Sequence, residues 1–217
     1  MKTKVIASVI CLILFLLLIA GVKTVDVAPI GPEGTSIGLS GINGAIHEAT
    51  DVSLLLYKLT NYLGILSILV GLCFALFGLI QLIRRKSLLK VDTEILVLGG
   101  LYIVLALLYV LFELVVINTR PAILPGEVHP EASFPSSHTM LTFVILGSIM
   151  MIIGKYVKNR SICTLVQVVC GILIMVMVFG RLLSGVHWFT DILAGVLIST
   201  ALLFSFAAVL DQVSKRE

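Results

Sequence analysis

Two residues near the end of the chain, His187 and Asp191, have types and a spacing that suit catalysis. Residues four apart on a helix share one face. A carboxylate in that position can accept the proton of one imidazole nitrogen and leave the other nitrogen free as a nucleophile or a base. The alternative is an interfacial histidine followed by an aspartate that only caps a helix. The pair alone does not decide between these interpretations.

A second polar segment, Pro135-Ser136-Ser137-His138, stands directly before an apolar run. Ser136 or Ser137 can cap a helix there, and the free N–H groups of a helix start favour an anion. His138 beside that anion is placed to give a proton to a leaving oxygen. An ordinary N-cap with a surface histidine is the alternative.

Two arginines, Arg120 and Arg181, complete the set of candidates. Their planar donors suit bidentate contact with phosphoryl oxygens, although either side chain could instead extend to lipid headgroups. Phosphate-binding arginines, a helix start, a proton donor and a histidine oriented by an aspartate together describe phosphoryl transfer. The combination is far more specific than any of its parts.

The composition of the chain indicates the environment in which these residues lie. Of 217 residues, 59% are hydrophobic and 12% are charged, and the mean hydropathy is +1.16. A soluble domain is about 45–50% apolar and about 25% charged. These values favour a membrane protein and argue against a soluble enzyme, a disordered chain and a nucleic-acid-binding protein.

Six apolar runs are long enough, or nearly so, to cross a bilayer, which takes about 20 residues each. They predict an all-α, integral membrane six-helix bundle in which residues 1–217 form a single domain. The first run could instead be a signal peptide, but its apolar part is long and no clear cleavage site follows, which favours a retained span. The runs are Val5–Val22, Tyr62–Ile83, Ile95–Ile117, Thr139–Gly154, Ser161–Leu183 and Ile192–Leu210.

The distribution of Lys and Arg predicts the orientation. With the N-terminus inside, 11 of the cations fall in cytoplasmic segments and 4 toward the outside. By the positive-inside rule, both termini are expected in the cytoplasm. The candidate residues then all face outward, on a cytoplasmic membrane, beside a long first external loop at Lys23–Asn61. Within that loop we expect an interfacial helix at Asn43–Leu56 with Asn43 as its N-cap, and we expect His47 and His129 to be solvated.

The three motifs resemble those of the type 2 phosphatidic acid phosphatase family, membrane lipid phosphatases related to vanadium haloperoxidases. That family's pattern is Lys-x6-Arg-Pro, Pro-Ser-Gly-His and Ser-Arg-x5-His-x3-Asp. Order and internal spacing match in all three. The corresponding segments here are Glu113-x6-Arg120-Pro121, Pro135-Ser136-Ser137-His138 and Gly180-Arg181-x5-His187-x3-Asp191.

The resemblance implies a role for each catalytic residue. His187 attacks phosphorus to form a phosphohistidine, Asp191 orients its ring, and His138 protonates the leaving group and then helps water to hydrolyse the intermediate. The substrate-binding residues that it implies are Arg120, Arg181, Ser136 and Ser137, with nearby backbone amides. It implies no metal and no other cofactor, and the four cysteines form no ligand-spaced pair.

The implied activity is hydrolysis of a lipid phosphate, such as undecaprenyl diphosphate, phosphatidylglycerophosphate or phosphatidate. A lipid phosphotransferase that uses the same histidine, and a non-catalytic lipid-phosphate binder or flippase, remain open. Glu113 is the most important departure, because it replaces a lysine expected to contact phosphate. We expect its carboxylate to pair with Arg120 or Arg181. A carboxylate that points to water or headgroups, or that meets a cationic group of the substrate, is the alternative.

Overall fold

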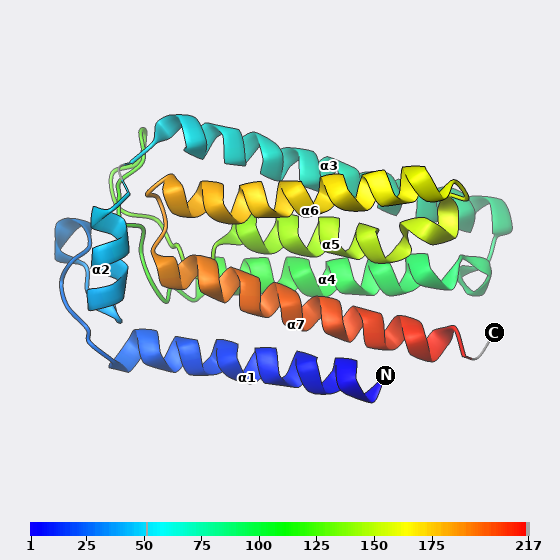
Figure 1. The fold of residues 1–217 in the computed structure, drawn as a ribbon, viewed down its shortest axis with the longest axis horizontal. Helices are drawn as coiled ribbons and strands as arrows, with labels where there is room; N and C mark the ends of the chain where they lie inside the picture. Colours follow the sequence, from blue (N-terminus) through cyan, green and yellow to red (C-terminus); the bar gives the residue numbers. More distant parts are fainter. Residues whose placement is uncertain (51, 216–217) are drawn as a thin grey trace.

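The structure is a computed structural model, and it describes residues 1–50 and 52–215. Within them the chain is helical and contains no strand, and the long helices run side by side (Figure 1). The helices are α1 (Lys2–Thr24), α2 (Ser40–Glu48), α3 (Leu54–Arg85), α4 (Thr93–Leu114), α5 (Ser137–Tyr156), α6 (Arg160–Leu183) and α7 (Phe189–Val213), with two 3-10 turns at Pro32–Gly34 and Leu88–Lys90.

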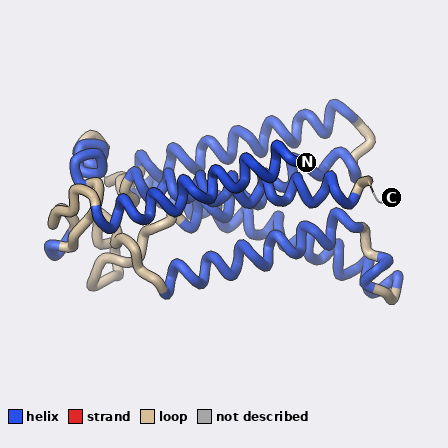
Figure 2. Tube along the Cα trace, turned by 90° about the horizontal axis from the view of Figure 1, so that it is seen from below, coloured by secondary structure: helices blue, strands red, loops and turns tan. Residues whose placement is uncertain are grey.

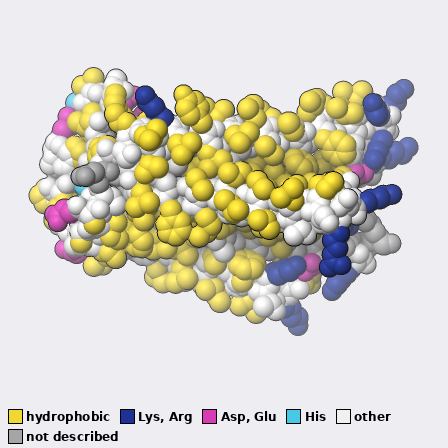
Figure 3. All heavy atoms as spheres, turned by 45° about the horizontal axis from the view of Figure 1, so that its top comes forward, with side chains coloured by type: hydrophobic (Ala, Val, Ile, Leu, Met, Phe, Trp, Pro, Cys, Tyr) yellow, Lys and Arg dark blue, Asp and Glu magenta, His cyan; other side chains and the backbone are white. Residues whose placement is uncertain are grey.

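Six of the helices, all except α2, are long and apolar enough to span a membrane. Their outward faces carry large exposed aliphatic side chains, which cover the middle of the molecule in Figure 3. Such a surface would be unstable in water but matches the hydrocarbon of a bilayer. The predicted all-α six-span bundle is therefore confirmed, and the chain is a multi-pass membrane protein.

Helix α5 lies in the middle of the bundle, where α3, α4, α6 and α7 pack against it. In its most apolar window 61% of the residues are buried, and α7 follows with 50%, whereas the other spans have 17–22%. The two most enclosed helices are thus the two whose first turns carry His138 and Asp191. Residues at those helix starts are held by neighbours on several sides.

The ends of the helices differ from the apolar runs. Helix α3 starts at Leu54, eight residues before the predicted Tyr62, because Ser53 caps it by accepting the Leu56 N–H (3.4 Å) and its first two turns are partly polar. Helix α7 starts at Phe189 instead of Ile192. Both helices extend beyond their hydrophobic segments toward the same end of the bundle.

The connection between α1 and α3 gathers at that end, where Figure 2 shows most of the loops. The predicted helix Asn43–Leu56 is wrong: α2 occupies Ser40–Glu48, and Asn43 lies inside it and fully buried. Before α2 the chain passes so close to the end of α1 that a Cβ on Gly38 would lie 1.8 Å from the Val22 carbonyl oxygen. Only glycine fits there, and the close crossing fixes the entry into α2.

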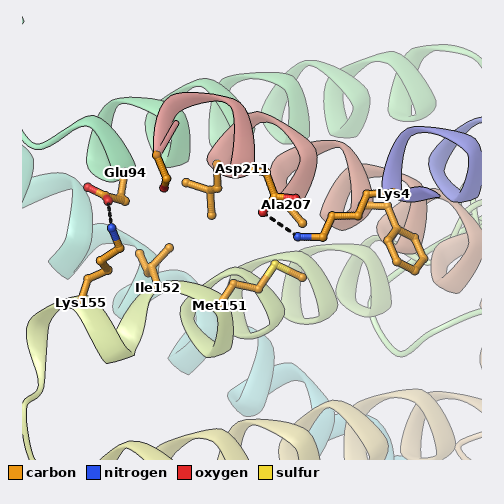
Figure 4. A pocket seen from close by; sticks show the side chains of 10 residues that line it. Lys4, Glu94, Met151, Ile152, Lys155, Ala207 and Asp211 are labelled. Atoms are coloured by element: carbon orange, nitrogen blue, oxygen red, sulfur yellow. Dashed lines mark hydrogen bonds and ion pairs between the residues drawn. The ribbon is translucent and has the colours of Figure 1, made fainter. Parts of the chain in front are cut away.

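The opposite end of the bundle holds both described ends of the chain (Figure 1). There α1 is fastened to α7, since Lys4 Nζ lies 2.8 Å from Asp211 Oδ1. A second ion pair, Lys155 Nζ to Glu94 Oε1 at 2.6 Å, joins α5 to α4. A pocket of about 420 Å³ separates the two pairs (Figure 4). Lys and Arg side chains gather at this end, as Figure 3 shows.

Candidate active site

The candidate residues come together at the end that carries α2. The start of α5 is docked on the start of α7, because the Ser136 N–H donates to the Asp191 carbonyl (3.0 Å). Gly195 allows this approach: a Cβ there would lie 3.2 Å from the Ser136 carbonyl oxygen and from Thr139. The second and third motifs are therefore neighbours through backbone contacts, at the same end of the bundle.

His187 and Asp191 are adjacent, although not on one helix as their spacing suggested. His187 lies in the turn before α7, and Asp191 lies in its first turn. The His187 Nδ1 to Asp191 Oδ2 distance is 3.6 Å, and both side chains are buried. The carboxylate also accepts the Trp188 N–H (3.0 Å) and the Asn118 side-chain amide (3.3 Å). Asp191 thus caps α7 and faces the histidine at the same time.

The other ring nitrogen, Nε2 of His187, lies 3.2 Å from Nη1 of Arg120. A guanidinium can only donate, so Nε2 accepts and the ring proton of the neutral imidazole is on Nδ1, toward Asp191. Burial, and then the positive charges of Arg120 and Arg181, hold the pKa of His187 well below its usual value. The imidazole is therefore neutral near pH 7, with a lone pair on Nε2.

Arg120 is held from two directions. Its Nε donates to Glu131 Oε2 (2.9 Å) and its Nη1 reaches the Val186 carbonyl (3.3 Å). The backbone N–H of Arg120 also donates to the Glu131 carbonyl (2.9 Å). The loop between α4 and α5 thus folds back on itself and presents the guanidinium to His187.

Arg181 is fully buried near the end of α6. Its Nη1 donates to Thr60 Oγ1 (3.3 Å), and its Cζ lies 5.2 Å from the centre of the Tyr57 ring. Its Nε and Nη2 have no hydrogen-bond partner among the described residues. Buried donors of a cation without acceptors are costly, and they are suited to binding the oxygens of an anion.

His138 stands in the first turn of α5, half-buried against α3. A Cβ on Gly64 would lie 2.7 Å from its Cδ2, so glycine makes room for the ring. Its Nδ1 is buried and has no partner among the described residues. Arg120 and Arg181 are both close enough to act on it electrostatically. The positive charges of the first and third motifs therefore both act on this histidine.

The two serines differ in position. Ser136 is the N-cap residue of α5, but its side chain makes no capping bond; its buried Oγ accepts from Thr139 Oγ1 (3.1 Å). Ser137 lines a small cavity with His187 and Glu113. Its volume is about 10 Å³, about the space for one water molecule.

The predicted pairing of Glu113 with an arginine is wrong. No cationic group of residues 1–50 and 52–215 forms an ion pair with it, and Arg120 uses Glu131 instead. Glu113 is exposed near the end of α4 and lies beside Tyr109 at the small cavity. The reason is the fold of the loop between α4 and α5. The bridge between Thr119 and Ala132 places Glu131 beside Arg120, so Glu131 and not Glu113 is the ion-pair partner.

Several residues that contact the candidate site residues were not predicted from the sequence. Tyr57 and Thr60 come from the first turns of α3, a segment that we expected in the external loop. Only their spacing of three residues indicates that they share a helix face. Asn118 and Glu131 lie in the loop between α4 and α5, where no periodicity marks a contact. Among the described residues, no group of three or more His, Cys, Asp or Glu side chains is arranged to hold a metal ion.

Comparison with known proteins identifies the family of the chain. The PAP2 superfamily matches residues 94–215, which contain all three motifs. No curated protein matches the chain. Its fold is similar to the crystal structure of the first transmembrane PAP2 type phosphatidylglycerolphosphate phosphatase from Bacillus subtilis, with 22% identity, a TM-score of 0.66, and 95% of this chain and 96% of that chain covered. The family match extends over more than half of the sequence, and the chain belongs to the PAP2 superfamily.

Proposed function

We propose that the chain is an integral membrane lipid phosphatase that passes a phosphoryl group first to Nε2 of His187 and then to water. One observation carries the proposal: a buried, neutral His187 directs Nδ1 toward Asp191 and Nε2 toward Arg120. The charge of Arg181 acts on the same ring, and its Nε and Nη2 have no partner among the described residues. This arrangement suits a nucleophile beside a binding site for phosphoryl oxygens.

In the first half-reaction, the lone pair of Nε2 forms a bond to phosphorus while the bond from phosphorus to the leaving oxygen breaks. His138, which takes up a proton when the anionic phosphoryl group binds between it and the arginines, gives that proton to the leaving oxygen. The lipid therefore leaves as a neutral alcohol, or as a lipid phosphate if the substrate is a diphosphate. The imidazole of His187 becomes cationic, and Asp191 stabilises it. Arg120 and Arg181 hold the equatorial oxygens as charge redistributes.

In the second half-reaction, water attacks phosphorus and the bond from Nε2 to phosphorus breaks. His138, now neutral, takes a proton from that water, which restores both histidines and releases inorganic phosphate. The cations that face phosphate belong to the chain itself. We therefore propose that turnover needs no metal ion, so that it continues in the presence of EDTA.

The substrate class is a phosphomonoester or diphosphate lipid: undecaprenyl diphosphate, phosphatidylglycerophosphate or phosphatidate. The Bacillus subtilis protein of similar fold is a phosphatidylglycerolphosphate phosphatase, so that lipid is the first to test. We propose that the site faces outward from a cytoplasmic membrane with both termini inside. The 11-to-4 split of Lys and Arg supports this orientation.

The test is phosphate release by detergent-solubilised protein over a panel of these lipids, with EDTA present. His187→Ala should abolish release, and His138→Ala should slow it at least about 10²-fold, the scale of a lost general acid. His129→Ala is the matched control, because its side chain is 77% exposed. Transfer to an added alcohol would indicate a phosphotransferase. Lipid binding without release by the wild type would indicate a binder or flippase and would contradict the proposal.

A further inference from the structure

The side chain of Asn43 in α2 is buried with 0% exposure and uses both atoms of its amide. Its Nδ2 donates to the Gly38 carbonyl (2.9 Å) and to Thr190 Oγ1 (3.1 Å). Its Oδ1 accepts the backbone N–H of Thr190 (3.2 Å). One side chain thus joins the loop before α2 to the first turn of α7, 147 residues later in the sequence.

The N–H of Thr190 belongs to the group of donors that lack a partner inside a helix, because Thr190 lies in the first turn of α7. Two side chains satisfy donors at this helix start. Asp191 accepts the Trp188 N–H, and Asn43 accepts the Thr190 N–H. Asn43 therefore acts as a cap supplied by another helix, directly beside the residue that faces His187.

Helix α2 makes a second contact with the same turn. His47, which we expected to be solvated, packs its ring against Trp188, with the ring centres 5.3 Å apart. Trp188 in turn donates its indole N–H to the Thr119 carbonyl (2.7 Å), immediately before Arg120. The contacts of α2 therefore reach both sides of the site, although α2 lies outside the segment that matches the PAP2 superfamily.

We propose that Asn43 is a positioning residue of the active site: it fixes the first turn of α7 and so holds the Asp191 carboxylate behind His187. The inference rests on the proposed function and adds a residue to it. The carboxylate stabilises His187 most strongly once the ring becomes cationic, during bond formation to phosphorus. Loss of Asn43 therefore slows the chemical step and leaves substrate binding by the arginines nearly unchanged.

The test compares kcat and KM of three variants with the wild type. Asn43→Ala should lower kcat about 10- to 100-fold, the effect of a small misplacement in a site, with KM changed less than about twofold. Thr190→Val removes one acceptor and keeps the shape, and it should lower kcat about threefold or more. The double variant should be no slower than Asn43→Ala alone, since residues that act through one contact are not additive.

Asn159→Ala is the matched control. Asn159 caps α6, its Oδ1 accepting the Ser161 and Ile162 N–H groups (3.0 and 3.2 Å), and that helix start lies opposite the site. Its loss should lower the melting temperature with kcat unchanged. The proposal is overturned if Asn43→Ala behaves in the same way. If Asn43→Ala does not fold, Thr190→Val decides, and a wild-type kcat overturns the proposal. Absence of phosphate release by the wild type would refute the proposed function itself.

Discussion

Nε2 of His187 lies 3.2 Å from Nη1 of Arg120, and this contact fixes the proton of the imidazole on the far nitrogen. The arginine therefore performs two tasks before any substrate arrives. It selects the tautomer in which Nε2 carries the lone pair, and its charge disfavours protonation of the ring. When a phosphoryl group binds, the same guanidinium N–H can donate to a phosphoryl oxygen instead of Nε2. The lone pair of Nε2 is then free to attack phosphorus.

The pH dependence of the reaction follows from this contact. The pKa of His187 is lowered by burial and by the neighbouring arginines, so the nucleophile is lost only when the pH falls well below the usual histidine value of about 6.5. We expect kcat/KM to show no acid limb from His187 between pH 6.5 and 7.5. The profile must be corrected for ionisation of the substrate phosphate, measured by ³¹P NMR in the same micelles. A remaining acid limb with a midpoint at 6.5 or above contradicts this account.

Arg181 is predicted to bind phosphate through its unpartnered Nε and Nη2. Arg181→Lys keeps the charge but loses the planar pair of donors and the contact with Thr60. We expect kcat/KM to fall about 10²-fold, the scale for one lost donor to a transition state, and vanadate inhibition to weaken in parallel.

The matched control for Arg181→Lys is Arg160→Lys, an exposed arginine at the other end of the same helix. Its kcat/KM should equal that of the wild type. Equal values for Arg181→Lys as well would show that Arg181 has no part in binding phosphate.

Glu113 is predicted to oppose the binding of phosphate, because its carboxylate shares a small cavity with His187 and has no cationic partner among the described residues. Glu113→Gln should lower KM for an anionic lipid phosphate about 3- to 10-fold at low salt, since one exposed charge at short range contributes about 1 kcal/mol. Its melting temperature should not change. Glu127→Gln, at an exposed position of the loop between α4 and α5, is the control and should leave KM unaltered. A raised KM for Glu113→Gln would instead show that the carboxylate binds a cationic group of the substrate.

The orientation in the membrane can be tested with a membrane-impermeant maleimide on intact cells. Glu127→Cys lies in the loop at the site end, and Lys158→Cys lies in the turn between α5 and α6, and both positions are exposed. We expect labelling of the first and not of the second, with the unmodified chain as the background for its own cysteines. The opposite pattern would place the site in the cytoplasm.

The fold was predictable to the extent that hydrophobicity determines it. Apolar runs locate all six spans because the hydrocarbon of the bilayer selects them. They fail at helix ends, where polar residues continue a helix: α3 begins at Leu54 so that Tyr57 and Thr60 can reach Arg181. A helix that crosses the bilayer and also lines a polar site is apolar along one part of its length and polar along the other. Hydropathy locates only the apolar part.

The residues of the candidate site were predictable from the spacing of the motifs. The residues that hold them in place were not. The motif spacing predicted that His138, His187 and Asp191 lie at one site, but the predicted pairing of Glu113 with Arg120 or Arg181 was wrong. Glu131 and Asn43 reach the site through loop crossings and backbone pairing, which leave no periodic pattern in the sequence. Contacts of this kind depend on tertiary structure and not on a local sequence pattern.

The central claim is that His187 forms a covalent bond to phosphorus. The most direct measurement is a millisecond quench of the wild type with a lipid phosphate in alkaline denaturant, where phosphohistidine survives, followed by mass spectrometry of the peptide with residues 182–191. We predict phosphate on His187 in the wild type, and neither modified peptide nor phosphate release in His187→Ala. A His187→Ala protein that is folded and releases phosphate at close to the wild-type rate would contradict the account.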